Sequence, residues 1–165
     1  MREPGGAYRD LLTAAGCGRK VIVHCTTVSA VAMRYVNPVS GADHDVVLAG
    51  SMLHDIGRSQ THGIGHAQAG AEICRNLGLP EEVARIVERH TGAGLTADEC
   101  SLLGLLPIDC LPETLEEKIV ANADNLVGGG HEISIEKDLM EAFALKRKIR
   151  RRIYRLWLEM ELFRR

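Results

Sequence analysis

The fold of this chain is built around the segment Val46-Val47-Leu48-Ala49-Gly50-Ser51-Met52-Leu53-His54-Asp55-Ile56-Gly57-Arg58. Its first part, up to Leu53, is almost wholly apolar, as is typical of a helix buried on all sides. His54 and Asp55 do not suit such a place, because a buried carboxylate is very costly unless it is paired or bound to a metal. Imidazole nitrogen and carboxylate oxygen are both good ligands for a divalent transition metal. A His-Asp pair also arises by chance or as a hydrogen-bonded core element, so the pair alone does not establish a metal site.

Composition narrows the class of protein. A chain of 165 residues is long enough for one domain with a proper hydrophobic core. Its hydrophobic fraction of 45% and charged fraction of 25% are those of an ordinary globular protein. The net charge of -2 does not indicate a general nucleic-acid binder, and we expect no nucleic-acid partner.

Three features of the sequence predict a cytoplasmic protein without a membrane partner. Met1 to Tyr8 is polar and glycine-rich and does not resemble a secretory signal. The longest apolar run is far shorter than the roughly 20 residues that span a bilayer. The five cysteines contain no C-x-x-C pair and do not suggest a disulfide framework, which favours a reducing compartment.

Hydrophobic periodicity and helix-boundary residues predict an all-α fold. No window shows the sustained alternation, rich in β-branched residues, that is typical of strands. We expect a compact, single-domain helical bundle over residues 1–165, with Asp43 capping the buried helix, a loop over 91–111, and a flexible break at Gly128 to Gly130. Helices are predicted over residues 7–16, 20–35, 46–56, 66–77, 80–90 and 112–127, and over 134–164 as one long helix or two.

Several other residues do not fit their local pattern. His24 lies on an apolar helix face, His66 begins a helix, His90 ends one, and Asp124 shares a face with Val120. A lone histidine on an apolar face is more often a satisfied core residue, and histidines at helix ends are often caps. Metal binding, however, explains all of these misfits together with His54 and Asp55. His62 lies in the same loop region as His66 and is an alternative to it.

In this order, His24, His54-Asp55-Ile56-Gly57-Arg58 and Asp124 resemble the HD superfamily of metal-dependent phosphohydrolases, and specifically its HDIG-type members. Two further segments are similar to the H-x-x-x-G-A-E-I and E-K-I-V-x-x-A-D segments of these proteins. They are His66-Ala67-Gln68-Ala69-Gly70-Ala71-Glu72-Ile73, and Glu117-Lys118-Ile119-Val120 with Ala123-Asp124. The resemblance covers residues 20–128, which would form the metal-binding helical core. It leaves the C-terminal basic helix, residues 133–165, outside.

The resemblance implies a ligand set. His24, His54, Asp55 and Asp124 would bind one metal ion. His66 and His90 match positions that some members use for a second ion, with Asp55 bridging the two. His90-Thr91-Gly92 is also similar to the H-T-x-G stretch of bacterial HD-type diadenosine tetraphosphate hydrolases, although Ala93-Gly94 departs from a close match.

The residue types themselves indicate the chemistry. Imidazoles with a bridging carboxylate favour one or two ions of iron, manganese, nickel, cobalt or zinc over magnesium. A water bound to such an ion has its pKa lowered towards neutrality and attacks as hydroxide. Asp55 and Arg58 are therefore the candidate catalytic residues, with Arg58 placed to reach a phosphate oxygen. Lys118 is a second substrate-binding candidate, or simply a surface lysine.

These observations predict a phosphohydrolase that cleaves a phosphate ester or anhydride of a nucleotide-like small molecule at a binuclear site. The alternative is a metal- or nucleotide-binding regulatory module without turnover. A third reading is a helical interaction domain with structural histidines. The run of lysines and arginines over 146–155 is either a solvated helix face or a surface for an anion or partner, and a homodimer is possible.

Overall fold

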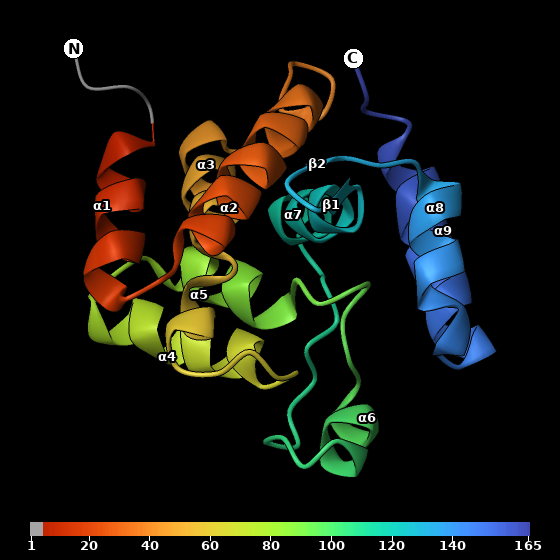
Figure 1. Ribbon diagram of the computed structural model, residues 1–165. Coiled ribbons are helices and arrows are strands. Elements are labelled where there is room, and N and C mark those ends of the chain that lie inside the picture. The colour runs from red at the N-terminus through yellow and green to blue at the C-terminus, as the bar shows by residue number, and fades with distance from the viewer. Residues whose placement is uncertain (1–4) are drawn as a thin grey trace.

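The computed structural model describes residues 5–165 and is almost wholly helical (Figure 1). The predicted all-α class is confirmed, since strands form only one two-stranded hairpin in this part of the chain. Residues 1–4 lie outside the described part of the chain. They belong to the stretch from Met1 to Tyr8 that does not resemble a secretory signal. The α-helices are α1 (Gly6–Ala15), α2 (Arg19–Ala32), α3 (His44–Leu53), α4 (His66–Asn76), α5 (Glu81–Arg89), α6 (Ala97–Leu102), α7 (Leu115–Asn125), α8 (Ile135–Glu141) and α9 (Arg147–Met160). Short 3₁₀ turns occur at η1 (Met33–Tyr35), η2 (Ile56–Ser59) and η3 (Ala142–Ala144).

Helix α3 is the buried helix that the sequence predicts. Asp43 caps it as expected, because its side chain accepts hydrogen bonds from the backbone amides of Asp45 and Val46. From Ala49 to Leu53 every residue is buried. The helix packs against α2, α5 and α7, so its C-terminal end lies inside the bundle. This burial places His54 and Asp55 among other helices, away from bulk solvent.

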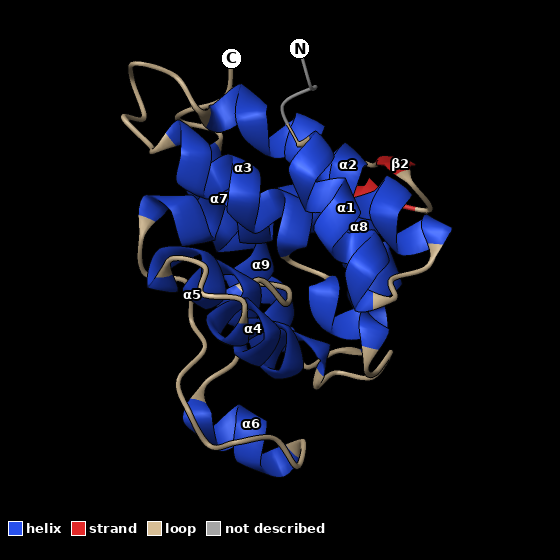
Figure 2. Cartoon of the chain, turned by 90° about the vertical axis from the view of Figure 1, so that its left-hand side faces the viewer, coloured by secondary structure: helices blue, strands red, loops and turns tan. Residues whose placement is uncertain are grey.

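Two apolar clusters hold the helices together. One joins residues of α2, α3, α5, α7 and α9, and the other joins residues of α1, α2, α3, α4 and α5. Figure 2 shows α4 and α5 stacked beside one another, with α6 on an extended loop away from the bundle. None of the described helices is long and apolar enough to cross a membrane. All five cysteines are buried and unpaired.

The predicted loop over 91–111 contains a helix, α6, which the sequence analysis missed. Thr96 accepts a hydrogen bond from the Glu99 amide, and the Glu99 side chain accepts one from the Thr96 amide. This reciprocal capping box stabilises a helix start and is visible in the sequence as T-x-x-E. The helix is only six residues long, too short for hydrophobic periodicity to reveal it.

The prediction of a flexible break at Gly128 to Gly130 is wrong. Strands β1 (Val127–Gly128) and β2 (His131–Glu132) pair antiparallel, and Gly129 and Gly130 form the two-residue turn between them. Both turn glycines have positive φ, 59° and 81°, as a type I′ hairpin turn requires. The three glycines therefore build an ordered turn.

The C-terminal segment forms two helices, α8 and α9, which lie side by side next to α7 and the hairpin (Figure 1). Ile153, Leu156 and Met160 of α9 are buried in the apolar cluster that includes α7. Two of the basic residues on α9 do not simply face solvent. Arg152 Nη2 lies 2.7 Å from Glu99 Oε2, and Lys148 Nζ lies 3.0 Å from Glu99 Oε1. Glu99 thus ties α6 to α9.

Replacing Glu99 with glutamine is expected to destabilise the protein by about 1–2 kcal/mol at pH 7. Burial alone would raise the pKa of this carboxyl, but the Thr96 amide, Arg152 and Lys148 lower it from 4.5 to about 2. An acid whose folded pKa is depressed contributes stability above its unfolded pKa and loses it as pH falls through the folded value. The difference between wild type and Glu99→Gln should therefore shrink as pH falls from about 4.5 towards 2.

Urea unfolding of both proteins between pH 3 and 7 measures this difference. Asp98→Asn is the matched control, because it removes the same charge from the same helix turn at an exposed position. Equal stability of wild type and Glu99→Gln at pH 7 would show that the contacts to α9 contribute nothing.

Candidate metal centre

Six side chains from separate parts of the fold converge at the buried end of α3. His54 follows the last residue of α3, and Asp55 precedes η2. His24 comes from α2, His66 is the first residue of α4, His90 follows the end of α5, and Asp124 lies near the end of α7. Nε2 of His24 lies 2.8 Å from Asp124 Oδ1, and Nε2 of His54 lies 3.4 Å from the same oxygen. Residues a hundred positions apart are thus in direct contact.

Asp55 stands between two pairs of imidazoles. Its Oδ2 lies 3.8 Å from His24 Nε2 and 3.9 Å from His54 Nε2. Its Oδ1 lies 3.2 Å from His66 Nε2 and 3.6 Å from His90 Nε2. Each carboxylate oxygen therefore faces a different pair of ring nitrogens. This is the arrangement suited to a carboxylate shared by two cations.

Backbone carbonyls fix the tautomer of three of the histidines. A carbonyl oxygen only accepts hydrogen bonds, so the Nδ1 atom facing it must carry the hydrogen. The neutral ring then presents the lone pair of Nε2 to the centre, which is how metal-binding histidines are commonly oriented. The Nδ1 contacts are His54 with Ser51 O at 2.8 Å, His66 with Gly63 O at 2.8 Å, and His90 with Val87 O at 2.7 Å.

The unsatisfied atoms of this cluster show that it fits metal ions. Nε2 of His66 and Nε2 of His90 lie 3.1 Å apart, and in neutral rings both are lone pairs that repel one another. Among the described residues, His54 Nε2 and Asp55 Oδ1 are buried without a hydrogen-bond partner. Buried polar atoms are rarely left unpaired in native proteins. Divalent cations would satisfy all four atoms, and the cluster contains two groups with ligand atoms close enough to hold one.

The charges of the cluster agree with cation binding. Burial alone would raise the pKa of Asp55 and of Asp124, but the surrounding histidines hold both well below the usual range. Burial lowers the pKa of His90, which is therefore neutral at pH 7. Burial would also lower the pKa of His54, but Cys25, Asp55 and Asp124 raise it well above its usual value. These neighbours therefore favour a positive charge at His54 Nε2, either a proton on the ring or a bound metal ion.

Gly57 sets the distance between the two halves of the cluster. A Cβ atom at this position would overlap the carbonyl oxygen of His66 and lie 2.6 Å from the amide nitrogen of Gly70. Only glycine allows η2 to approach the first turns of α4 this closely. That approach places Asp55 opposite His66.

Arg58 lies at the rim of the cluster. Its Nε donates a 2.7 Å hydrogen bond to Asp55 Oδ2, and its Nη1 donates one of 3.2 Å to the carbonyl oxygen of His62. The side chain is 30% exposed, so it is partly accessible from outside. Arg58 therefore orients Asp55 in addition to facing the solvent.

The other candidates lie away from the cluster. The His62 side chain is exposed, whereas His66 is buried within the cluster, so the structure favours His66. Lys118 Nζ lies 2.7 Å from Glu159 Oε1 on α9. It precedes Asp124 by six positions on α7, which turns the two side chains about 120° apart around the helix. The structure thus does not bring Lys118 to the metal centre.

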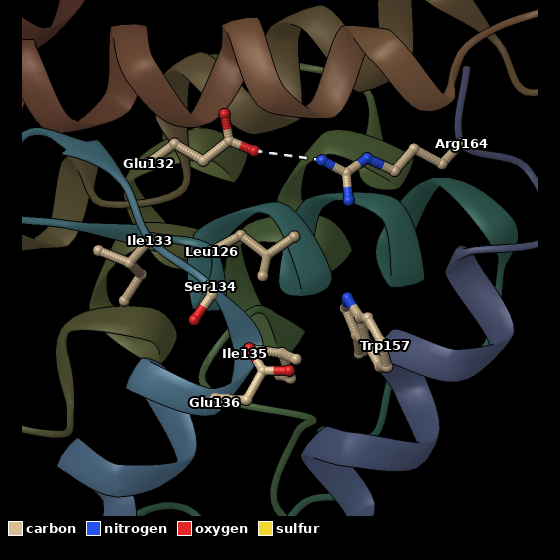
Figure 3. Close-up of a pocket in the computed structure, with 8 residues that line it drawn as sticks. All are labelled: Leu126, Glu132, Ile133, Ser134, Ile135, Glu136, Trp157 and Arg164. Atoms are coloured by element: carbon tan, nitrogen blue, oxygen red, sulfur yellow. Dashed lines mark ion pairs between the residues drawn. The ribbon is translucent and has the colours of Figure 1, made fainter.

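Of two cavities, one reaches a residue of this centre and the other does not. One of about 430 Å³ lies between the hairpin, α8 and α9 (Figure 3). It contains none of the predicted site residues, and its arginine, Arg164, is already paired with Glu132 at 3.6 Å. The other, of about 690 Å³, reaches His24 and is lined by Arg19 and Lys20. No motif in the sequence marks these two cations, so neither was among the predicted site residues.

A model of the HD domain family matches residues 21–128. The chain therefore belongs to the HD domain family, the metal-dependent phosphohydrolases that its motifs resemble.

Several proteins are similar in sequence to this chain. The chain is 49% identical over 131 residues to the uncharacterized protein MJ0778 of Methanocaldococcus jannaschii, with 77% of each protein covered. It is 49% identical over 126 residues to a tRNA (cytidine(56)-2'-O)-methyltransferase of Picrophilus torridus, covering 76% of this chain but only 36% of that enzyme. Ribonuclease Y of Cutibacterium acnes is 34% identical over 76 residues, which cover 44% of this chain and 14% of that protein.

Solved structures show the same fold. The HD domain of the L. monocytogenes phosphodiesterase PgpH, in complex with cyclic-di-AMP, superposes with a TM-score of 0.57 and 14% sequence identity. The match covers 94% of this chain and 95% of that one. None of these matches is a diadenosine tetraphosphate hydrolase, so the similarity at His90 to Gly92 stays a prediction.

Proposed function

We propose that this chain hydrolyses a phosphate ester or anhydride of a nucleotide-like small molecule at a centre of two divalent transition-metal ions. One observation carries the proposal: the two oxygens of Asp55 face two different pairs of imidazoles. His24, His54, Asp55 and Asp124 would hold one ion. His66, His90 and Asp55 would hold the other.

The donor set of imidazoles and carboxylates favours iron, manganese, nickel, cobalt or zinc. When bound, such ions supply positive charge at the transferring phosphoryl group and a nucleophile at neutral pH. Asp55 stays anionic and shares its charge between both positions. Arg58 holds Asp55 through Nε and presents the outer edge of its guanidinium to a phosphate oxygen, where a planar fork suits bidentate contact. Lys118 would contribute to substrate binding only at the periphery.

The relatives support a phosphodiester of nucleotides as the substrate class. The PgpH phosphodiesterase domain has been crystallised with cyclic-di-AMP, and several of the matched relatives are ribonucleases Y. We further propose that residues 1–165 act as one HD domain in a reducing cytoplasm. The docking of α9 on α7 and the five unpaired cysteines support this view. The exposed face of α9 would be the contact surface of a homodimer.

Metal analysis combined with a hydrolysis screen tests the proposal. Protein prepared without chelators is expected to bind two ions per chain and to hydrolyse linear or cyclic dinucleotides. His90→Ala should lose one ion and on the order of 100-fold in rate. His44→Ala is the matched control, since His44 is an exposed histidine whose only side-chain partner within residues 5–165 is the neighbouring Asp45.

Two results would overturn parts of the proposal. Unchanged metal content in His90→Ala would refute the second ion. A fully loaded protein that binds nucleotides but hydrolyses none of them would favour the regulatory module without turnover.

A further inference from the structure

We propose that Arg19 and Lys20 form a phosphate-binding subsite beside the metal centre. It would take a second phosphate group of the substrate, while the scissile phosphate lies at the metal ions. This inference rests on the proposed function and narrows its substrate class to nucleotides with at least two phosphates, such as a 5′-phosphorylated dinucleotide.

The subsite is a cavity of about 690 Å³ that reaches His24, one of the six side chains of the candidate metal centre. Its lining residues are Arg19, Lys20, Val23, His24, Gly129 and Gly130. One wall is the first part of α2, and the other is the turn of the hairpin, which lies beside α2 (Figure 1). A hydrogen bond of 3.1 Å from Thr27 Oγ1 to the carbonyl oxygen of Gly130 holds the two walls together. Because His24 belongs to both the cavity and the metal cluster, a single ligand can occupy both.

The cations of this cavity are free to bind an anion. Within residues 5–165, neither Arg19 nor Lys20 forms an ion pair or a side-chain hydrogen bond, and both are exposed. This differs from the cavity of Figure 3, where Glu132 already neutralises Arg164. The N-terminal cap of α2, Gly18, offers no side-chain acceptor to the first amides of the helix, which adds to the positive potential. Two unpaired cations next to a phosphohydrolase centre favour a phosphate over a neutral group.

The spacing suits a substrate with two phosphates. Lys20 precedes His24 by four residues, which corresponds to about 6 Å along the same face of the helix. Arg19 precedes it by five residues, about 140° around the helix, and also lines the cavity. Between them Val23, 44% exposed, offers apolar surface to a sugar or base. Gly129 and Gly130 leave the opposite wall without side chains, and a Cβ at Gly130 would come within 3.3 Å of Val23 Cγ1. The cavity therefore offers cations for a phosphate at one end and apolar surface in the middle. Its other end reaches the candidate metal centre.

Binding of two probes tests the subsite without relying on turnover. Both are diadenosine dinucleotides with a hydrolysis-resistant phosphorothioate linkage, and only one carries a 5′-phosphate. The double variant Arg19→Ala/Lys20→Ala is expected to bind the 5′-phosphorylated probe about 10- to 100-fold more weakly than wild type. Its Kd for the probe without this phosphate and its metal content should stay unchanged.

The matched control is Lys146→Ala/Arg151→Ala. It removes the same two charges from exposed positions of the chain, and neither side chain has a partner among the described residues. This control should bind both probes like wild type. Equal weakening of both probes in Arg19→Ala/Lys20→Ala, no weakening of either, or a wild type that binds neither would overturn the subsite.

The failure of the subsite and the failure of the proposed function give different results. A wild type that hydrolyses dinucleotides but does not distinguish the two probes refutes the subsite alone. A metal-loaded wild type that distinguishes the probes but hydrolyses no dinucleotide refutes the hydrolase and leaves the subsite as part of a binding module.

Discussion

Asp55→Asn is expected to remove both metal ions and to lower the rate of hydrolysis by about a thousandfold or more. Asparagine has nearly the same shape as aspartate, so the bundle should still fold. The amide is neutral and has only one oxygen, whereas the two oxygens of Asp55 each face a separate pair of imidazoles. The variant therefore loses the shared charge without a change in packing. Metal content and initial rate, measured on the same preparation, check this result.

Arg58→Ala tests whether Arg58 acts mainly on metal binding or on substrate binding. Arg58 contacts Asp55 through Nε and the backbone carbonyl of His62 through Nη1. Its removal is expected to lower metal affinity by about tenfold, the lower end of the effect of losing a group that orients a ligand. The main effect should be a higher KM. Equal loss of metal in Arg58→Ala and Asp55→Asn would show that Arg58 has a different role.

Gly57→Ala is expected to have the second-largest effect, a loss of about 3 kcal/mol in the free energy of unfolding together with the loss of one ion. The added methyl group would overlap the carbonyl oxygen of His66 and crowd the amide of Gly70. Both are backbone atoms, so α4 must move as a whole. His66 would then move away from Asp55.

Urea unfolding and metal analysis of Gly57→Ala measure both effects. Gly63→Ala is the control, because a Cβ there meets only Thr61 Oγ1, at 3.5 Å, and the backbone is not in the left-handed region. A Gly57→Ala protein with wild-type stability and two ions would mean that close approach of η2 to α4 is not required.

The helices around the metal centre could be predicted because their signals are local. The apolar run from Val46 to Leu53 predicted α3, and polar residues in apolar surroundings pointed to the candidate ligands. His66 and His90 were harder to assign, since histidines are also common at helix ends. Only the three-dimensional arrangement shows that their ring nitrogens lie 3.1 Å apart.

Other features depend on contacts that the sequence does not display. Three successive glycines are compatible with a mobile joint and with a tight turn, and the pairing of Val127 with Glu132 decides between them. The cavity beside Arg19 and Lys20 exists because this hairpin folds over α2. Apolar residues spaced three and four apart on α9 indicate a face that packs on the bundle or on a second copy of the helix, and in the structure it packs on α7. This spacing did not indicate that Glu99 would pair with Lys148 and Arg152 of α9.

The most direct test of the binuclear centre is anomalous X-ray scattering from crystals of protein prepared without chelators and supplied with zinc. We predict one peak bound by His24, His54, Asp55 and Asp124, with metal–ligand distances of roughly 2.0–2.2 Å. A second peak should lie about 3.5–4 Å away, beside His66 and His90 on the other oxygen of Asp55. The absence of any peak at Asp55, or a peak that none of these six side chains contacts, would contradict the account.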